Sequence, residues 1–290
     1  MQTRKPLVAG QFYAGTRDSC LAELTECLGE RTINQPLPET IVAGILPHAG
    51  WVFSGSVAAM VFSAVKRQNK AVDTFVIFGA AHGYYGPEPA VYDKGAWLTP
   101  LGELPIDEVL AEQVLQDSPA VANLQAHAGE DSIEVQVPFV QHLFPDAKLL
   151  AILTPPADEA IEVGRCVGRI AKESDRKIVC IGSTDLTHYG PRYGFAPMGT
   201  GEKALKWASE VNDREFIDFA LGMNPQKMLD SAGRNCNACG AGAAAAAVAA
   251  AKELGRTSGI LLAHTDSNTI MAEKTGSRSS ESVGYAAIVF

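Results

Sequence analysis

Three histidines in this sequence each follow a short apolar segment. His48 ends the segment TIVAGILPH, His82 ends TFVIFGAAH, and His188 ends KIVCIGSTDLTH, which also contains Asp185. The segments are β-branched and apolar on both faces, which is typical of strands buried within a parallel sheet. In open α/β sheets the carboxyl ends of such strands form the ligand-binding crevice. The pattern predicts a shared metal or acid/base centre, with His48 and His82 at the ends of neighbouring strands.

A metal ion held by two imidazoles needs a further ligand, and Cys239 is the best candidate. It lies in RNCNACGAG, directly before an alanine-rich segment that predicts a helix. A helix N-terminus lowers the pKa of a thiol and favours the thiolate that binds metal. We therefore predict a metal site of His48, His82 and Cys239. Asp185 and His188 are predicted as acid/base groups or further ligands; the alternative is an aspartate helix cap with a nearby surface histidine.

The six cysteines do not have the spacing of a disulfide framework, so we expect reduced thiols. Cys236 and Cys239 form a C-x-x-C pair, which leaves a redox dithiol open as an alternative to a single thiolate ligand. The sequence has no second pair of this kind, so a zinc knuckle is not predicted.

The remaining histidines and nearby acids are interpreted as structural or surface residues. Glu130 and Glu134 could share one helical face with His127, but acids at this spacing usually lie in solvent. His142 falls in a helix-like segment, and His264 ends a late strand without an evident partner. We expect these two histidines to be structural.

Composition argues against several classes of protein. The chain has 290 residues, 47% of them hydrophobic, so it can bury a large core. Its net charge of −9 and the absence of a basic patch in the sequence argue against binding nucleic acid. Neither a signal peptide nor an apolar run of about 18 residues is evident. We expect a cytoplasmic protein that does not bind membranes.

The order of predicted elements is that of one α/β domain over residues 1–290, with a mostly parallel or mixed central sheet. Helices are predicted over 16–29, 54–68, 106–116, 158–174, 207–221, 225–232 and 240–254, and further strands over 148–153, 258–264 and 283–290. Segment 83–105 predicts a loop with one hairpin, and 266–282 a polar loop. In segment 127–144, a helix either kinks or begins at Pro138.

Eight segments together resemble a known family over nearly the whole chain. They are PLVAGQFY, ILPHAGWVFSG, FGAAHG, TPLGELPID, EDSIEVQVPF, STDLTHYG, NACGAG and SVGYAAIVF. In this order they resemble the Memo-like family, also called AmmeMemoRadiSam system protein B. That family is similar in fold to the class III extradiol ring-cleaving dioxygenases, whose three-layer α/β/α sandwiches hold non-haem iron(II) by two histidines and a carboxylate. The resemblance implies this fold and a metal pocket of His48, His82 and Cys239, with Asp185 and His188 as catalytic residues beside it.

The resemblance also implies a function. We expect a metal-dependent redox enzyme acting on a small molecule, with iron(II) as cofactor and a radical SAM protein as the partner that the family's name suggests. Thiolate in place of carboxylate favours softer ions, so copper or zinc is an alternative. A non-catalytic metal-binding or peptide-binding adaptor module and a metal hydrolase are the other hypotheses. Ala14 stands where the family often has proline, and Asp131 stands where it often has histidine. Both differences are expected to alter the rim of the pocket.

Overall fold

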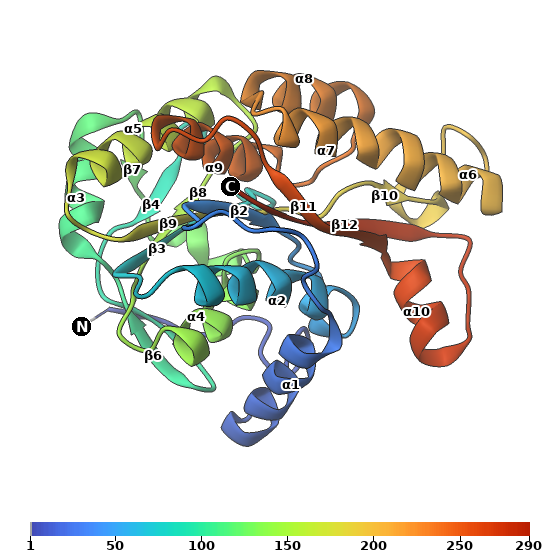
Figure 1. Ribbon diagram of the computed structural model, residues 1–290, viewed down its shortest axis with the longest axis horizontal. Helices are drawn as coiled ribbons and strands as arrows, with labels where there is room; N and C mark the ends of the chain where they lie inside the picture. Colours follow the sequence, from blue (N-terminus) through green and yellow to red (C-terminus); the bar gives the residue numbers. More distant parts are fainter. Residues whose placement is uncertain (1) are drawn as a thin grey trace.

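Within residues 2–290, which the computed structural model describes, a nine-stranded mixed sheet forms the centre of the molecule (Figure 1). Its order is β10 (His188–Tyr189), β12 (Ser282–Val289), β2 (Ala43–Leu46), β9 (Ile178–Ser183), β3 (Thr74–Gly79), β8 (Lys148–Leu153), β4 (Ala90–Tyr92) and β7 (Val121–Ala122), with β11 (Ile260–Asp266) also paired to β12. Strands β2, β9, β3 and β8 are parallel, whereas β12 and β4 run antiparallel to their neighbours β2 and β8. The α/β class and the mixed sheet are confirmed.

The prediction that His48 and His82 follow neighbouring strands is wrong. Strand β9 lies between β2 and β3 and pairs with both in parallel. The crossover from β2 to β3 passes over one strand position, and β9 fills that position later in the chain. The strand that leads to Asp185 and His188 is therefore flanked by the strands that lead to the other two histidines.

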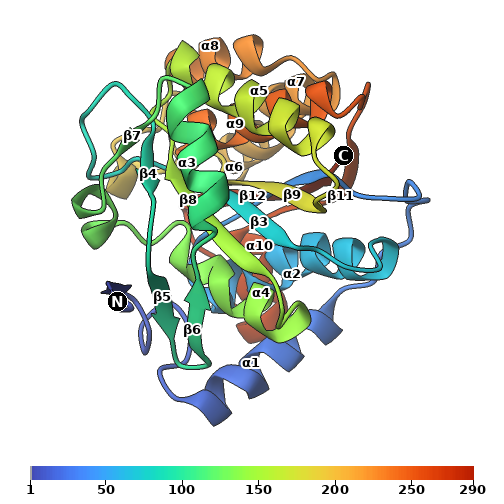
Figure 2. The same cartoon turned by 90° about the vertical axis from the view of Figure 1, so that its left-hand side faces the viewer.

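Helices cover both faces of the sheet (Figure 2). One face carries α1 (Arg17–Glu30), α2 (Trp51–Gln68), α4 (Val137–Leu143) and α10 (Ser267–Thr275), whose apolar residues share one core cluster. The other carries α3 (Glu108–Asp117), α5 (Asp158–Glu173), α7 (Arg214–Leu221), α8 (Pro225–Asn235) and α9 (Ala241–Glu253), which share the second cluster. Strands β2, β9, β3 and β12 are buried along their whole length because both faces are covered.

Small residues let α9 pack closely against its neighbours. A Cβ atom added to Gly164 of α5 would lie 2.2 Å from the Ala246 carbonyl oxygen, and one added to Gly182 of β9 would lie 2.7 Å from the Ala243 carbonyl oxygen. Alanine and glycine are therefore required for α9 to approach both α5 and the sheet. This packing sets the N-terminus of α9, which follows Cys239, beside the end of β9.

Two predicted loops contain more structure than expected. Segment 83–105 includes the expected hairpin, β5 (Ala96–Thr99) with β6 (Gly102–Pro105), which joins β1 (Thr3–Arg4) in a small sheet; it also includes β4 of the main sheet. Segment 266–282 is not a loop throughout, because α10 begins after Asp266, whose side chain accepts hydrogen bonds from the amides of Asn268 and Thr269. Such capping satisfies the free amides of a first helical turn.

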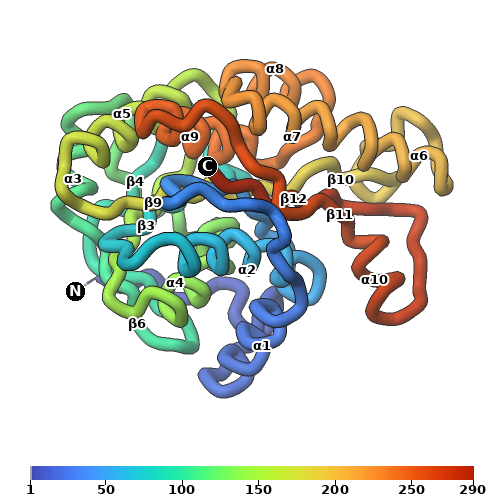
Figure 3. Tube along the Cα trace, in the orientation of Figure 1, coloured from blue at the N-terminus to red at the C-terminus, as the bar shows by residue number. Residues whose placement is uncertain are grey.

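Three helical segments clarify the remaining predictions. Pro138 lies in the first turn of α4, after the short 3-10 segments η1 (Gln125–Gly129) and η2 (Glu134–Gln136), so the helix begins there and does not kink. The helix predicted over 207–221 is part of a longer one, made of α6 (Glu202–Trp207), the π-helical segment η4 (Ala208–Asp213) and α7. A short 3-10 turn, η3 (Pro191–Tyr193), precedes it. Figure 3 shows the course of the backbone through α6 and α7. Among residues 2–290, no helix has the length and hydropathy to cross a membrane.

Candidate metal centre

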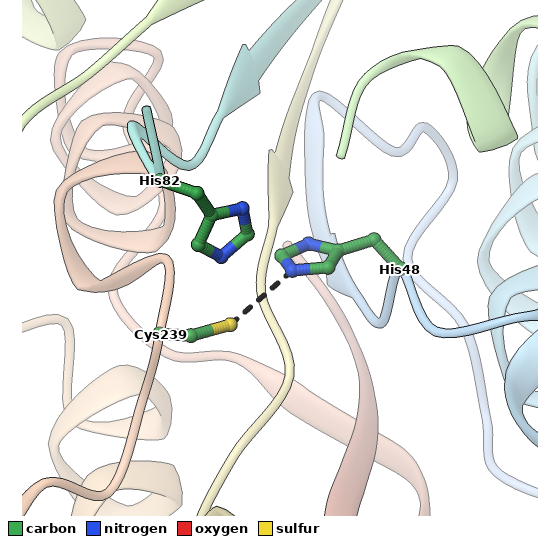
Figure 4. Close-up of side chains that lie close together, drawn as sticks. All are labelled: His48, His82 and Cys239. Carbon is green, nitrogen blue, oxygen red and sulfur yellow. Dashed lines mark hydrogen bonds between the residues drawn. The ribbon is translucent and has the colours of Figure 1, made fainter. Parts of the chain in front are cut away.

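The five predicted site residues all lie near the carboxyl ends of the central strands of the sheet. His48 and His82 follow β2 and β3, while Asp185 and His188 follow β9. Cys239 lies just before α9, near His82, and its sulfur points toward His48 (Figure 4). One ligand atom each of His48, His82 and Cys239 lie within 4.8 Å of one another. The structure therefore brings together the three residues that the sequence suggested as metal ligands.

His48 presents its Nε2 atom to Cys239. Its Nδ1 atom lies 3.1 Å from the Ser183 hydroxyl oxygen, and that hydroxyl donates its own hydrogen to the Ser132 carbonyl at 2.7 Å. The Ser183 oxygen must therefore accept, which places the imidazole hydrogen on Nδ1. When the ring is neutral, Nε2 therefore holds the free lone pair, 3.2 Å from the Cys239 sulfur. This is the tautomer that a metal ligand needs.

His82 is held in the same tautomer by a buried carboxylate. Its Nδ1 atom lies 3.0 Å from Glu130 Oε1, and its backbone amide donates to Oε2 at 2.9 Å. Burial raises the pKa of Glu130, but hydrogen bonds from His82 and Ser132 outweigh burial and lower the pKa to about 2. Because an ionised carboxylate only accepts hydrogen bonds, Nδ1 of His82 carries a hydrogen, and Nε2 is the atom that can bind metal once it has given up its own proton.

Cys239 is set up to be a thiolate. Burial opposes ionisation of the thiol, but the neighbouring His48, His188 and His82 together hold its pKa well below the ordinary value. Burial likewise lowers the pKa of His48, yet the negative charge of Cys239 outweighs it and raises this pKa to about 9. Protonated imidazoles stabilise the thiolate when no metal is bound, and each gives up its Nε2 proton when it becomes a metal ligand.

The donor set fits a single transition-metal ion. Ligands about 2.0 to 2.3 Å from one ion lie roughly 3 to 4 Å apart. The 3.2 Å between Cys239 Sγ and His48 Nε2 falls within that range, and the rings of His48 and His82 are nearly perpendicular, with centroids 5.3 Å apart. Two imidazoles and a thiolate are ligands that zinc, iron and copper accept.

Asp185 and His188 lie beside this set, and the structure gives them different roles. Asp185 Oδ1 accepts from the backbone amides of His48, at 2.8 Å, and Ala49, at 3.3 Å, so the carboxylate fixes the turn that carries His48. His188 Nε2 is 3.9 Å from Asp185 Oδ2, too far for a hydrogen bond, and has no partner within the described residues. A buried nitrogen without a partner is poised to bond a ligand.

A cavity of about 510 Å³ opens onto the three histidines. Aromatic side chains form much of its wall, among them Phe12, Phe53, Tyr193 and Tyr285. Asp131 also lines it, and the ring of Tyr193 packs on His188 with centroids 5.3 Å apart. A concave pocket of this size with an apolar wall and convergent polar groups is typical of a small-molecule site.

The prediction that Glu130 and Glu134 are surface acids is wrong. Glu130 is 2% exposed and orients His82, while Glu134 is fully buried and accepts from Arg4, two backbone amides and the Tyr13 hydroxyl. The helical spacing was misleading because Glu130 lies outside any helix and Glu134 begins the short 3-10 segment η2. Glu134 is buried because it pairs at 2.7 Å with Arg4, a cation that is itself buried, and no feature of the local sequence marks that pair.

The other polar residues that the sequence raised lie outside the ligand set. Cys236 is exposed and ends α8 in a left-handed conformation, and the six cysteines are all unpaired. His142 is exposed, whereas His127 is fully buried. His264 does have a partner, since its Nε2 atom lies 3.1 Å from Asp213 Oδ2.

Comparison with known proteins points to one family along the whole chain. A family model described as "Memo-like protein" matches residues 4–289. The chain is similar to a "MEMO1 family protein" of Thermococcus onnurineus, at 36% identity over 99% of both chains. It is also similar to MEMO1 family proteins of Methanosarcina mazei, at 36% identity, and Pyrobaculum aerophilum, at 33%. Both of these matches cover 100% of this chain and 99% of the relative.

Proposed function

The chain belongs to the Memo-like protein family, and on that premise we propose that it is a metal-dependent enzyme that oxidises a small molecule. One divalent ion, iron(II) by preference and zinc or copper as alternatives, would be held by His48, His82 and Cys239. The observation that carries this proposal is the orientation of both histidines: Ser183 and Glu130 hold their Nδ1 atoms, so that two Nε2 atoms and the Cys239 sulfur face a common point.

The cavity supports an enzyme over a closed structural metal site. Structural zinc sites use all their coordination positions on protein atoms, whereas catalytic sites leave one open. The ligand set proposed here uses three protein residues, and a cavity of about 510 Å³ faces them; Asp185 and His188, which also lie close to Cys239, are left for the substrate side. An iron ion in such a site would supply open positions for dioxygen and substrate, as in non-haem oxygenases. On this proposal the fold is related to that of the extradiol dioxygenases.

The chain's own residues supply proton transfer and orientation. We assign proton exchange with the substrate to His188, because its buried Nε2 has no protein partner and it lines the cavity. Asp185 holds the backbone of His48 and adds negative charge near His188, so it orients the site in addition to any proton transfer. Phe12, Phe53 and Tyr285 exclude water from the wall of the pocket.

Metal content tests the proposal directly. Protein purified without oxygen is expected to contain about one metal ion per chain by elemental analysis, and His48→Ala or His82→Ala is expected to remove it. His142→Ala is the matched control, because this exposed histidine lies on α4, outside the ligand set. Full metal occupancy in both site variants would place the metal elsewhere. Stoichiometric metal without turnover of any oxidisable small molecule would favour a non-catalytic metal-binding module.

A further inference from the structure

A buried polar cluster behind the metal site joins the two chain segments that carry Cys239 and His188. The cluster is centred on Asn212 and Asp213, the last two residues of the π-helical segment η4, which are 3% and 1% exposed. π-helical turns are rare and occur frequently at functional sites. Neither residue touches the cavity, so their burial needs another explanation.

Both residues bind Thr187, the neighbour of His188. Asp213 Oδ1 accepts from the Thr187 amide at 2.9 Å, and Asn212 Nδ2 donates to the Thr187 hydroxyl at 3.0 Å. The other oxygen of Asp213 lies 3.1 Å from His264 Nε2, which anchors the carboxylate to β11. Gly284 makes room for it, since a Cβ atom there would lie 2.1 Å from Asp213 Oδ2. The turn between Asp185 and His188 is thus held from behind.

The same asparagine also binds the segment that leads to Cys239. Asn212 Nδ2 donates to the Asn235 carbonyl at 3.0 Å, and the Asn212 carbonyl accepts from Asn237 Nδ2 at 3.0 Å. Closer to the site, the Cys239 amide donates to the Asp185 carbonyl at 3.2 Å. Segments 184–188 and 235–239 are therefore tied together both at the metal site and behind it.

We propose that Asn212 and Asp213 are positioning residues that hold these two segments in register, so that the Cys239 sulfur and His188 face one metal pocket. The inference rests on the proposed function, because it concerns the ligand geometry of that site. Groups that orient metal ligands typically contribute 10- to 100-fold to metal affinity. Asn212 acts through the backbone on either side of the ligands, so we expect the lower end, about tenfold.

The test uses cobalt(II) as a spectroscopic probe in the full chain. Cobalt bound to a thiolate gives a charge-transfer absorption that depends on the metal–sulfur geometry. Asn212→Ala is expected to weaken cobalt(II) binding about tenfold and to shift or weaken this band at saturating cobalt. Asn69→Ala is the matched control, because Asn69 also makes two side-chain hydrogen bonds, both to Ile41, at the opposite edge of the sheet. It is expected to leave affinity and band unchanged.

A gentler pair of variants guards against misfolding of Asn212→Ala. Thr187→Val keeps the shape of the side chain but removes the hydroxyl that Asn212 binds, whereas Thr187→Ser keeps the hydroxyl. Only the valine variant is expected to lose affinity and change the band. Equal spectra and affinities for Asn212→Ala and Asn69→Ala, or for the two Thr187 variants, would overturn the inference. A wild-type band that survives in Cys239→Ser would instead refute the proposed ligand set itself.

Discussion

Glu130→Gln tests whether the buried carboxylate behind His82 acts on the metal or only on the fold. The substitution keeps the size of the side chain but leaves one accepting oxygen in place of two. Glu130 Oε1 accepts from His82 Nδ1 and the Ser132 amide, both at 3.0 Å, and Oε2 accepts from the His82 amide at 2.9 Å. The amide group of glutamine must therefore face at least one donor.

Two effects of known size follow. Leaving one buried donor unpaired costs about 1 to 3 kcal/mol of unfolding free energy. Losing the carboxylate that orients a histidine ligand and raises its basicity typically lowers metal affinity about 10- to 100-fold. We expect both losses in Glu130→Gln, measured by denaturant unfolding of the metal-free chain and by competition of zinc(II) between the protein and a chelator.

Glu134→Gln separates the two effects. Glu134 is as deeply buried and accepts four hydrogen bonds, from Arg4, the amides of Leu7 and Val8, and Tyr13, but it contacts no histidine. We expect it to lose at least as much stability while the folded protein keeps wild-type zinc affinity. The reasoning is refuted if the two variants lose zinc affinity equally, because Glu130 would then act only through stability.

Three further predictions address single residues. In Cys239→Asp or Cys239→Glu, the side chain that reaches the ion should shift the metal preference from zinc and copper toward iron(II), because carboxylate oxygen is the harder donor. Metal competition measures this preference, and an unchanged preference in both variants would remove Cys239 from the ligand set. His188→Ala should keep the metal in elemental analysis but abolish turnover, and loss of metal would make it a ligand. Burial lowers the pKa of His127 to about 3 in the folded chain. Below about pH 6.5 this histidine therefore binds a proton in the unfolded chain but stays neutral in the folded chain. The free energy of unfolding, measured in urea, should therefore fall by about 2 kcal/mol more in the wild type than in His127→Asn between pH 7 and pH 5. Equal falls in the two proteins would contradict this account.

The sequence was most informative where a residue follows a strand. His48, His82 and the Asp185–His188 pair were placed at strand ends from apolar segments alone, because buried parallel strands need continuous apolar residues. Cys239 was found from its position before an alanine-rich helix, and the packing of α9 on β9 explains why that helix had to be made of small residues. Each of these signals lies within a short stretch of the chain, so it can be recognised from a single sequence.

The supporting groups could not be predicted because their partners are distant in the chain. Glu130 is 48 residues from His82, and Ser183 is 135 residues from His48. No local pattern distinguishes a glutamate that orients a histidine from one that lies in solvent. The insertion of β9 between β2 and β3 was missed for a related reason, since strand order depends on which strand later fills a vacant position in the sheet.

The buried charges around the site bear on which ion it suits. A divalent ion with two neutral imidazoles and the Cys239 thiolate keeps one positive charge, which the ionised Glu130 balances. Copper(I) in the same place would leave the charge of Glu130 uncompensated, at a cost on the order of a few kcal/mol at an effective dielectric of 20. Two other carboxyls, Asp185 and Asp131, lie near the site, and burial raises the pKa of both. Copper(I) is preferred only if its stronger bond to the thiolate gains more free energy than this charge imbalance costs. We therefore infer a divalent ion. On this reasoning Glu130→Gln should weaken zinc(II) binding more than copper(I) binding.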